Sequence, residues 1–241
     1  MSFHRPIIVL SLLHRLEHTF QFGGVVLEWF RSYLVGRQQH VRTSSSSSTP
    51  AVITCGVPQG SVLGPILFLL YTADLLSLIE SHGFNPHLFA DDTQILGSCQ
   101  PSASQHLLMR MSACIDEVAA WMCSNRLQLN TAKTEFLWST NSRRLHQLPQ
   151  LPLRVGSDHI APASVVRDLG IYIDNDVSMR SHVAKTVSTC HAVLRQLRTI
   201  RRSVSRPVLQ SLVTSLVLSR LDYGNATLVG RRFIIIITAR C

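Results

Sequence analysis

The stretch Phe89-Ala90-Asp91-Asp92-Thr93 lies in the middle of a short run, residues 87–96, in which apolar and polar side chains mix. The pattern predicts one strand over residues 87–90 and a second strand over residues 93–96. The two adjacent aspartates are therefore expected at the bend of a tight hairpin. Because charges at a hairpin tip are usually only solvated, the aspartates alone indicate no particular chemistry.

A loop rich in glycine and proline precedes this hairpin. It reads Cys55-Gly56-Val57-Pro58-Gln59-Gly60-Ser61 and leads into an apolar helix predicted from Ile66 to Ile79, which is expected to be buried all round. A loop at a helix start can approach phosphate groups, and paired carboxylates can hold divalent metal ions. This order favours metal-assisted phosphoryl transfer. Asp74, within the helix, is expected to be a hydrogen-bonded carboxylate and not a metal ligand.

Composition narrows the class of protein. With 46% hydrophobic and 15% charged residues among 241, the chain is not expected to be disordered as a whole. A net charge of +9 favours an anionic partner, first nucleic acid and second a membrane surface. The six cysteines form no C-x-x-C pair, which predicts free thiols in a reducing compartment. We expect neither a signal peptide nor a membrane span at residues 1–13, and an intracellular protein, nuclear or cytoplasmic.

Further elements are predicted from periodicity and turn residues. They are helices at residues 10–20, 25–34 and 102–124, strands at 51–55, 134–138 and within 165–173, and two helices within 177–221. In the second helix, Trp29, Phe30 and Tyr33 are expected to pack in the core. The five serines from Ser44 to Ser48 are expected to form a flexible loop.

Several segments together resemble the reverse transcriptases of non-LTR (LINE-type) retrotransposons. The first two are the loop Pro58-Gln59-Gly60-Ser61 and the hairpin Phe89-Ala90-Asp91-Asp92. The later ones, in the order of that family, are Asn125-Arg126-Leu127-Gln128-Leu129-Asn130 with Lys133-Thr134-Glu135, then Arg167-Asp168-Leu169-Gly170-Ile171-Tyr172-Ile173-Asp174, then Leu221-Asp222-Tyr223-Gly224-Asn225. The resemblance covers residues 12 to 230.

The resemblance implies an α+β fold with a polymerase palm, an antiparallel sheet with helices on one face, followed by a helical thumb. Residues 1–176 would form a partial palm and residues 177–230 a basic thumb, with residues 231–241 unassigned. The fingers that precede the palm in the family are absent from the chain. The implied partners are an RNA template, a DNA primer and deoxynucleoside triphosphates, without a membrane.

The resemblance also implies roles for particular residues. Asp91 would be a principal ligand of Mg²⁺, with Mn²⁺ as a possible substitute, and Asp92 its weaker neighbour. Pro58, Gln59, Gly60 and Ser61 would shape the nucleotide and template pocket. Lys133 would lie near the triphosphate.

The predicted thumb is unusually basic. Residues 177–221 contain no acidic side chain and eight cations, whose density favours contact with phosphates. Arg195, Arg198, Arg201 and Arg202 are the residues expected to meet a nucleic-acid backbone.

Three alternatives remain open at this stage. The family has another metal-binding aspartate before its first palm helix, but the matching segment, residues 3–9, has no acid. The chain is then either a polymerase domain or a catalytically inactive remnant that at most binds nucleic acid, and we expect no polymerisation by the chain alone. A third possibility is an unrelated protein with a coincidental hairpin. His14-Arg15-Leu16-Glu17-His18 also fits the H-x-x-E-H spacing of inverted zinc peptidases, although an ordinary amphipathic helix is expected there.

Overall fold

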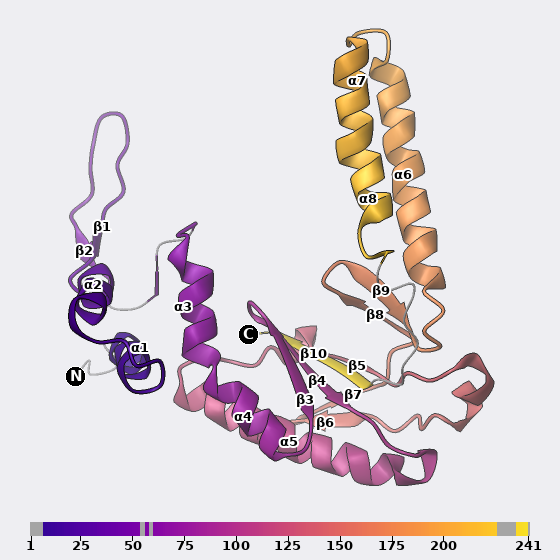
Figure 1. Cartoon of the computed structure of the whole chain (residues 1–241), viewed down its shortest axis with the longest axis horizontal. Helices are drawn as coiled ribbons and strands as arrows, with labels where there is room; N and C mark the ends of the chain where they lie inside the picture. The colour runs from indigo at the N-terminus through magenta and orange to yellow at the C-terminus, as the bar shows by residue number, and fades with distance from the viewer. Residues whose placement is uncertain (1–6, 54–55, 58–59, 226–234, 241) are drawn as a thin grey trace. The chain divides into compact units, whose positions relative to one another are not determined.

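The computed structural model describes residues 7–53, 56–57, 60–225 and 235–240 (Figure 1). Its α-helices are α1 (Ile7–His18), α2 (Gly24–Leu34), α3 (Leu63–Thr72), α4 (Asp74–Ser81), α5 (Ser104–Ser124), α6 (Arg180–Ile200), α7 (Arg206–Val213) and α8 (Ser219–Asp222). Short 3₁₀ segments are η1 (Pro101–Ala103), η2 (Thr131–Lys133) and η3 (Ser142–Gln147), and η4 (Thr214–Leu218) is a π-helical turn.

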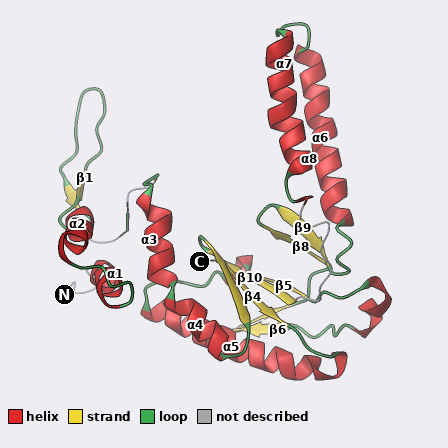
Figure 2. Ribbon diagram, in the orientation of Figure 1, coloured by secondary structure: helices red, strands yellow, loops and turns green. Residues whose placement is uncertain are grey.

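The strands are short (Figure 2). They are β1 (Gln38–Gln39), β2 (Ala51–Val52), β3 (Asn85–Phe89), β4 (Asp92–Gly97), β5 (Glu135–Leu137), β6 (Leu153–Val155), β7 (Asp158–Ile160), β8 (Val165–Asp168), β9 (Ile171–Asp174) and β10 (Ile235–Arg240). One sheet has four strands in the order β3-β4-β10-β5, and the pairs β1–β2, β6–β7 and β8–β9 form separate antiparallel hairpins. Helices with small antiparallel sheets agree with the α+β class.

The chain forms two compact units, each built from separate stretches of sequence. The first contains residues 1–93, 114–130 and 240–241, and the second contains residues 94–113 and 131–239. The predicted boundary between residues 176 and 177 lies inside the second unit, and the assignment of palm and thumb to these ranges stays a prediction.

The core of the first unit is formed by α1, α2 and α3. Its buried members are Val9, Leu12, Leu13 and Leu16 of α1, Leu27 and Leu34 of α2, and Leu67 and Tyr71 of α3. On α1 the leucines recur at the spacing of one helix face, and each buried leucine contributes about 1.5–3 kcal/mol. Trp29 is 51% exposed, its ring stacked on Tyr33 with centroids 5.7 Å apart, so its predicted place in the core is wrong.

The apolar segment after the loop is two helices that meet at Ala73. Its predicted burial all round is wrong: Leu67, Tyr71, Leu75 and Ile79 are buried, but the opposite face is exposed at Ile66, Leu69 and Leu76. The reason is that α1 packs against one side of α3, and apolar composition does not show which side has a neighbour. By length and composition alone, residues 63–81 could also cross a membrane, a criterion that core helices of soluble proteins meet too.

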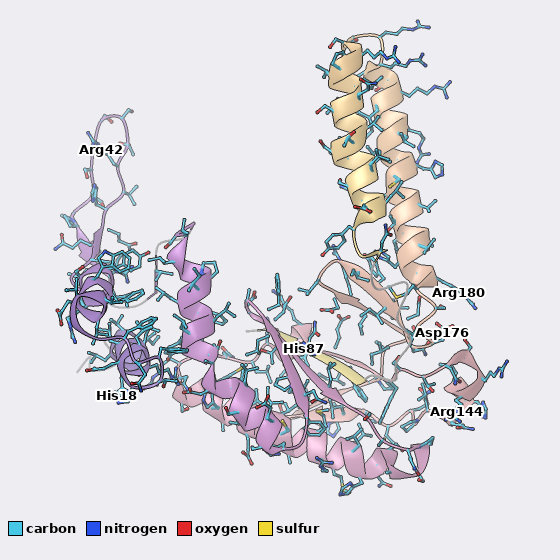
Figure 3. The ribbon with its side chains drawn as sticks, viewed as in Figure 1. His18, Arg42, His87, Arg144, Asp176 and Arg180 are labelled. Atoms are coloured by element: carbon cyan, nitrogen blue, oxygen red, sulfur yellow. The ribbon has the colours of Figure 1, made fainter. Side chains whose placement is uncertain are left out.

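The serine run forms the end of an ordered hairpin. The strands β1 and β2 pair antiparallel, and Arg42 and Ser47 form a further bridge. Near the tip, the Thr43 amide donates to the Ser46 carbonyl oxygen at 2.8 Å. Figure 3 labels Arg42 on this projecting hairpin. The backbone is therefore hydrogen-bonded where a flexible loop was expected.

In the second unit, β10 pairs antiparallel with β5. The register places Ile236 opposite Leu137 and Thr238 opposite Glu135. The residues left unassigned by sequence therefore include a strand. The helix pair of this unit follows β9: α6 runs beside α7, η4 and α8, which form a continuous helical segment after a turn at residues 201–205 (Figure 1).

Arg15 joins three separate segments of the first unit. Its Nε donates to Asp74 Oδ2 at 2.9 Å and its Nη1 to the Tyr71 carbonyl oxygen at 2.5 Å. Its Nη2 donates to Asn125 Oδ1 at 2.8 Å. The guanidinium also lies over the rings of Tyr71, at 4.6 Å, and Trp121, at 5.5 Å. Asp74 is therefore a hydrogen-bonded carboxylate, as predicted.

Tyr71 closes this network. Its hydroxyl donates to the Asn125 carbonyl oxygen at 2.8 Å. Burial raises the pKa of Tyr71, and the nearby Arg15 charge opposes that shift. The phenol thus stays neutral and keeps its proton for the hydrogen bond over the ordinary range of pH.

We expect Arg15→Met to lower the free energy of unfolding by about 2–4 kcal/mol, because acceptors on Tyr71 and Asn125 lose their donors. The loss stays below that of a fully buried ion pair since the Asp74 side chain is 43% exposed and can be rehydrated. The matched control is Arg31→Met, whose exposed pair with Glu28 at 3.5 Å should cost about 0.5 kcal/mol or less. Urea unfolding measures both, and equal losses would contradict the special role of Arg15.

Candidate metal and nucleic-acid site

The predicted hairpin is present with a strained tip, but its turn lies one residue earlier than predicted, so Asp92 belongs to a strand and not to the bend. The strand β3 ends at Phe89 and β4 begins at Asp92, so Ala90 and Asp91 form a two-residue turn. Ala90 has φ +52°, whereas Asp91 is not among the residues with positive φ. Positive φ at the first turn position usually requires glycine, as in type II′ turns. An alanine held there costs about 1–3 kcal/mol, and such strain often marks functional sites.

The two aspartates differ in exposure. Asp91 is exposed at the turn, and Asp92 is half-buried as the first residue of β4. The residue after them, Thr93, is buried, as is Ile95, so these side chains point to the other face of the strand. One carboxylate is therefore open to a ligand from solvent, and its neighbour is held by the sheet.

The donor set fits a divalent cation in part. Carboxylate oxygens are the ligands that Mg²⁺ prefers, and Asp91 and Asp92 supply two carboxylates at one turn. Among the described residues, however, no group of three or more His, Cys, Asp or Glu side chains is arranged to hold a metal ion. The hairpin therefore offers an incomplete set of protein ligands.

The loop before α3 is described in part. Pro58 and Gln59 lie outside the described residues. Gly60 has φ +80°, a conformation that glycine adopts readily. Ser61 Oγ and the Tyr33 hydroxyl are hydrogen-bonded at 2.5 Å, which ties the loop to α2.

A second bond ties the same loop to Arg37, three residues after the end of α2. Arg37 donates from Nη2 to the carbonyl oxygen of Gly56. Sequence reasoning missed Tyr33 and Arg37 as loop anchors, because nothing in local sequence pairs residues nineteen or more positions apart. The local sequence offered one signal for these anchors, the polar side chains that lie within and just after the aromatic helix α2.

Lys133 is exposed and is the last residue of η2. It belongs to the second unit, and its place near a triphosphate stays a prediction. Of the motif that precedes it, Asn125 has a structural role, since its side chain accepts from Arg15 and its Nδ2 donates to the Trp121 carbonyl oxygen at 2.8 Å.

The predicted thumb arginines lie at the end of α6 and in the following turn. Arg195, Arg198, Arg201 and Arg202 are all exposed. Figure 3 shows long, nitrogen-tipped side chains projecting from this end of the helix pair. Within the described part of the chain, none of the four forms an ion pair with a carboxylate. Their charges are therefore available to an anion, and their contact with a nucleic-acid backbone stays a prediction.

The last two motifs of the sequence meet in the second unit. The segment 165–173, predicted as one strand region, is the hairpin β8–β9 with a turn at Leu169 and Gly170, where φ is +44° and +87°. The Tyr223 hydroxyl donates to the Leu169 carbonyl oxygen. A Cβ on Gly224 would lie 3.0 Å from Ile171 Cδ1, so the chain passes close to β9. Residues after α8 thus fix the hairpin turn.

The hairpin β8–β9 also contacts β4. Gln94 Nε2 donates to Asp168 Oδ1. The Asp168 carboxylate is therefore a hydrogen-bond acceptor in the second unit, a role that the family resemblance did not specify.

The alternative zinc site is not supported among the described side chains. His14 and His18 are exposed with ring centroids 4.2 Å apart, but Arg15 between them points into the network of the first unit. Glu17 Oε2 lies 4.0 Å from His18 Nε2, and no described acidic ligand completes a cluster. The segment is an amphipathic helix, as expected.

The described cysteines, Cys99, Cys114, Cys123 and Cys190, are free thiols. Burial, with the nearby Glu117 charge, raises the pKa of Cys114 to about 12, so its thiol is unreactive at neutral pH. Cys114 is fully buried on α5, away from the residues of the candidate site.

Comparison with known proteins gives one family. A family model described as reverse transcriptase (RNA-dependent DNA polymerase) matches residues 8–165. The chain is 32% identical over 178 residues to a probable RNA-directed DNA polymerase from transposon BS of Drosophila melanogaster, which covers 70% of this chain and 19% of that protein.

Two further relatives have similar coverage. A probable RNA-directed DNA polymerase from transposon X-element of Drosophila melanogaster is 29% identical, over 64% of this chain and 16% of its own length. A Retrovirus-related Pol polyprotein from type-1 retrotransposable element R1 of Bradysia coprophila is 27% identical, over 72% and 16%. The chain thus spans less than a fifth of the length of these curated relatives. No solved structure matches it.

The contact between Gly224 and β9 can be tested with alanine. Gly224→Ala and Gly156→Ala both place a Cβ on left-handed backbone, with φ +81° and +60°, at about 1 kcal/mol each. Gly156 has no atom within 4 Å of that Cβ, whereas Gly224 would also meet Ile171. We expect Gly224→Ala to lose a further 1–3 kcal/mol, approximately, of unfolding free energy. Equal urea midpoints for the two variants would show that this contact does not hold the hairpin.

Proposed function

Because the chain belongs to the reverse transcriptase (RNA-dependent DNA polymerase) family, we propose that it is a fragment of a polymerase that joins deoxynucleotides to a primer 3′-hydroxyl along an RNA template. The family is the one predicted from the sequence, that of non-LTR retrotransposons. The observation that carries the proposal is the match over residues 8–165, which contains both the loop before α3 and the carboxylate hairpin. The relatives' names, RNA-directed DNA polymerases of transposons, support this reaction class.

We assign residues 1–176 to a palm and residues 177–230 to a thumb. The support is the antiparallel sheet that carries the carboxylate hairpin, and the helix pair that begins at Arg180. The positive charge of that pair suits contact with a nucleic-acid duplex. The partners in this proposal are an RNA template, a DNA primer and deoxynucleoside triphosphates, with no membrane.

Asp91 and Asp92 would hold Mg²⁺, or Mn²⁺ in its place. When bound, such an ion supplies an activated 3′-oxygen and neutralises charge on the phosphates. Support comes from the chemistry of two carboxylates on a strained turn, one of them exposed. Asp91 is the principal ligand because its side chain is exposed at the turn, and Asp92, half-buried at the start of β4, is its weaker neighbour.

Other residues of the chain would bind and orient the substrates. The loop of Pro58, Gln59, Gly60 and Ser61 shapes the pocket for nucleotide and template, and Tyr33 restrains Ser61 through their hydrogen bond. Lys133 is exposed and can donate a proton or a hydrogen bond to the pyrophosphate that leaves when the 3′-oxygen bonds to the α-phosphorus. Arg195, Arg198, Arg201 and Arg202 bind backbone phosphates.

A second candidate function is nucleic-acid binding without catalysis. Residues 3–9, where the family carries a further aspartate, contain no acid, and the first acidic residue of the chain is Glu17. Asp74 is already bound by Arg15. With only the hairpin carboxylates, the metal ions would lack one protein ligand. The 3′-hydroxyl and the α-phosphate would then be aligned less well for reaction. Electrostatic stabilisation of this kind is worth several kcal/mol, and about 1.4 kcal/mol changes a rate tenfold.

We therefore expect the chain alone to extend a primer several orders of magnitude more slowly than an intact relative. The measurement is extension of a DNA primer on an RNA template with Mg²⁺ and then with Mn²⁺, beside Asp91→Asn as the control that removes a carboxylate charge. Robust extension that disappears in Asp91→Asn would contradict the second candidate function, nucleic-acid binding without catalysis. It would show instead that the chain polymerises and that Asp91 is required.

The thumb assignment gives a separate prediction for Arg198→Ala combined with Arg201→Ala. If both arginines meet phosphates, the slope of log affinity against log salt should fall by about 0.7–0.9 for each lost contact. The measurement is fluorescence anisotropy of a labelled primer–template duplex at several salt concentrations. An unchanged slope would mean that this end of α6 is only a solvated face.

A further inference from the structure

A cavity of about 190 Å³ lies in the second unit where four of its segments meet. The segments are the end of β4 with the loop after it, the start of α5, the residues that follow β5, and η3. A single water molecule needs about 10–15 Å³ of such space, so the cavity can hold a small organic group. Its described lining includes none of the residues assigned above to the metal or nucleic-acid site.

Trp138 brings an unpaired hydrogen-bond donor to the lining of this cavity. The residue is 5% exposed, and its indole Nε1 is buried without an acceptor among the described atoms. A buried donor without an acceptor has lost its bonds to water and gained none in return, so such groups are rare. An acceptor atom on a molecule that enters beside the indole would supply the partner.

The indole is held in place by its neighbours. Its ring meets the ring of Phe136 edge-on, with the centroids 5.5 Å apart. The Phe136 carbonyl oxygen accepts from the Ala163 amide at 2.7 Å. On the other side of the indole, the Thr140 amide donates to the Asn175 carbonyl oxygen at 2.9 Å. A donor that is fixed in this way loses little conformational entropy when a ligand binds to it.

The charges around the cavity favour an anion. Arg144, which Figure 3 labels on η3, belongs to the lining and forms no ion pair with a described carboxylate. Neither the described lining nor the first turn of α5, which begins at Ser104, contains an acidic residue. The start of a long helix carries a partial positive charge from its backbone amides. Burial raises the pKa of Cys99 in the lining, so its thiol stays neutral and adds no negative charge.

We propose that this cavity binds a small organic carboxylate, a molecule with one negative charge on an apolar ring or branched chain. The guanidinium of Arg144 matches the two oxygens of a carboxylate, and the indole of Trp138 donates to one of them. The apolar part of the ligand packs against three further lining residues, Pro101, Leu148 and Pro149. Apolar walls with a few placed donors suit an organic anion better than inorganic phosphate, which is hydrated on every side.

The test uses the indole N–H of Trp138 as a reporter. The chain has three tryptophans, so a ¹⁵N-labelled sample gives three indole N–H signals, and Trp138→Phe identifies one of them. If that variant does not fold, Trp29→Phe and Trp121→Phe identify the same signal by elimination. The probes are benzoate and benzyl alcohol, which has the same ring without the charge. We expect benzoate to move the Trp138 signal downfield, as its N–H gains an acceptor, and benzyl alcohol to bind about tenfold more weakly.

Two neighbouring arginines of η3 provide a matched pair of variants. Arg144→Gln should weaken benzoate binding about tenfold or more, because a charge-assisted hydrogen bond becomes a neutral one. Arg143→Gln removes an exposed charge that is not in the described lining, and it should change the affinity by about twofold or less.

A Trp138 signal that stays in place with millimolar benzoate would overturn the proposal, as would equal shifts of all three indole signals. Equal losses in the Arg144 and Arg143 variants would also overturn it. An equal shift with inorganic phosphate at the same ionic strength would mean that the cavity accepts any anion, and would overturn the assignment to an organic carboxylate. The inference goes beyond the proposed function and does not depend on it, because the test involves neither primer extension nor nucleic acid.

Discussion

The guanidinium of Arg15 is the constraint on which the first unit depends. It is largely buried, and each of its three nitrogens donates to an acceptor on a different segment: Asp74, the Tyr71 carbonyl and Asn125. A buried cation without these acceptors would cost several kcal/mol. The helices α1 and α3 and the end of α5 must therefore pack so that all three nitrogens of the Arg15 guanidinium reach their acceptors together. This specifies the arrangement more tightly than leucine packing, which tolerates shifts.

The second unit uses carboxylates in a similar way around its hairpins. The buried Asp174 accepts from the Ser181 amide at 3.1 Å at the start of α6, where a negative charge is favourable. Burial acts to raise the pKa of Asp176, but hydrogen bonds from Ser178, the Arg180 charge and Ser142 outweigh it, so the pKa lies below its ordinary value. Figure 3 labels Asp176 and Arg180 at this end of α6. Asp174 and Asp176 therefore fix the start of α6, and neither forms a salt bridge with the arginines at the other end of that helix.

The sequence predicted those helices and strands that depend on periodicity and turn residues within one short segment. The strands on either side of Asp91, the buried stripe of α5 and the helix pair follow from periodicity and turns, and they are present. Pairing between β5 and β10 was not predictable, because it joins residues about a hundred positions apart. The exposed face of α3 was missed for the same reason, since composition does not reveal neighbours. At the candidate site, Asp91 could be placed at the tip, but the positive φ of Ala90 could not.

The distribution of charge separates binding from catalysis in this chain. Its described carboxylates with assigned roles are largely engaged in holding the fold: Asp74 by Arg15, Asp168 by Gln94, and Asp174 by the start of α6. Apart from Arg180, whose charge acts on Asp176, the cations of the helix pair have no such partners among the described carboxylates. Catalysis by metal ions requires several carboxylates that converge, whereas binding a polyanion requires only unneutralised cations that are accessible. A chain that leaves the arginines at the end of α6 without carboxylate partners, and engages acids in its fold, can therefore retain nucleic-acid binding even where its metal site is incomplete.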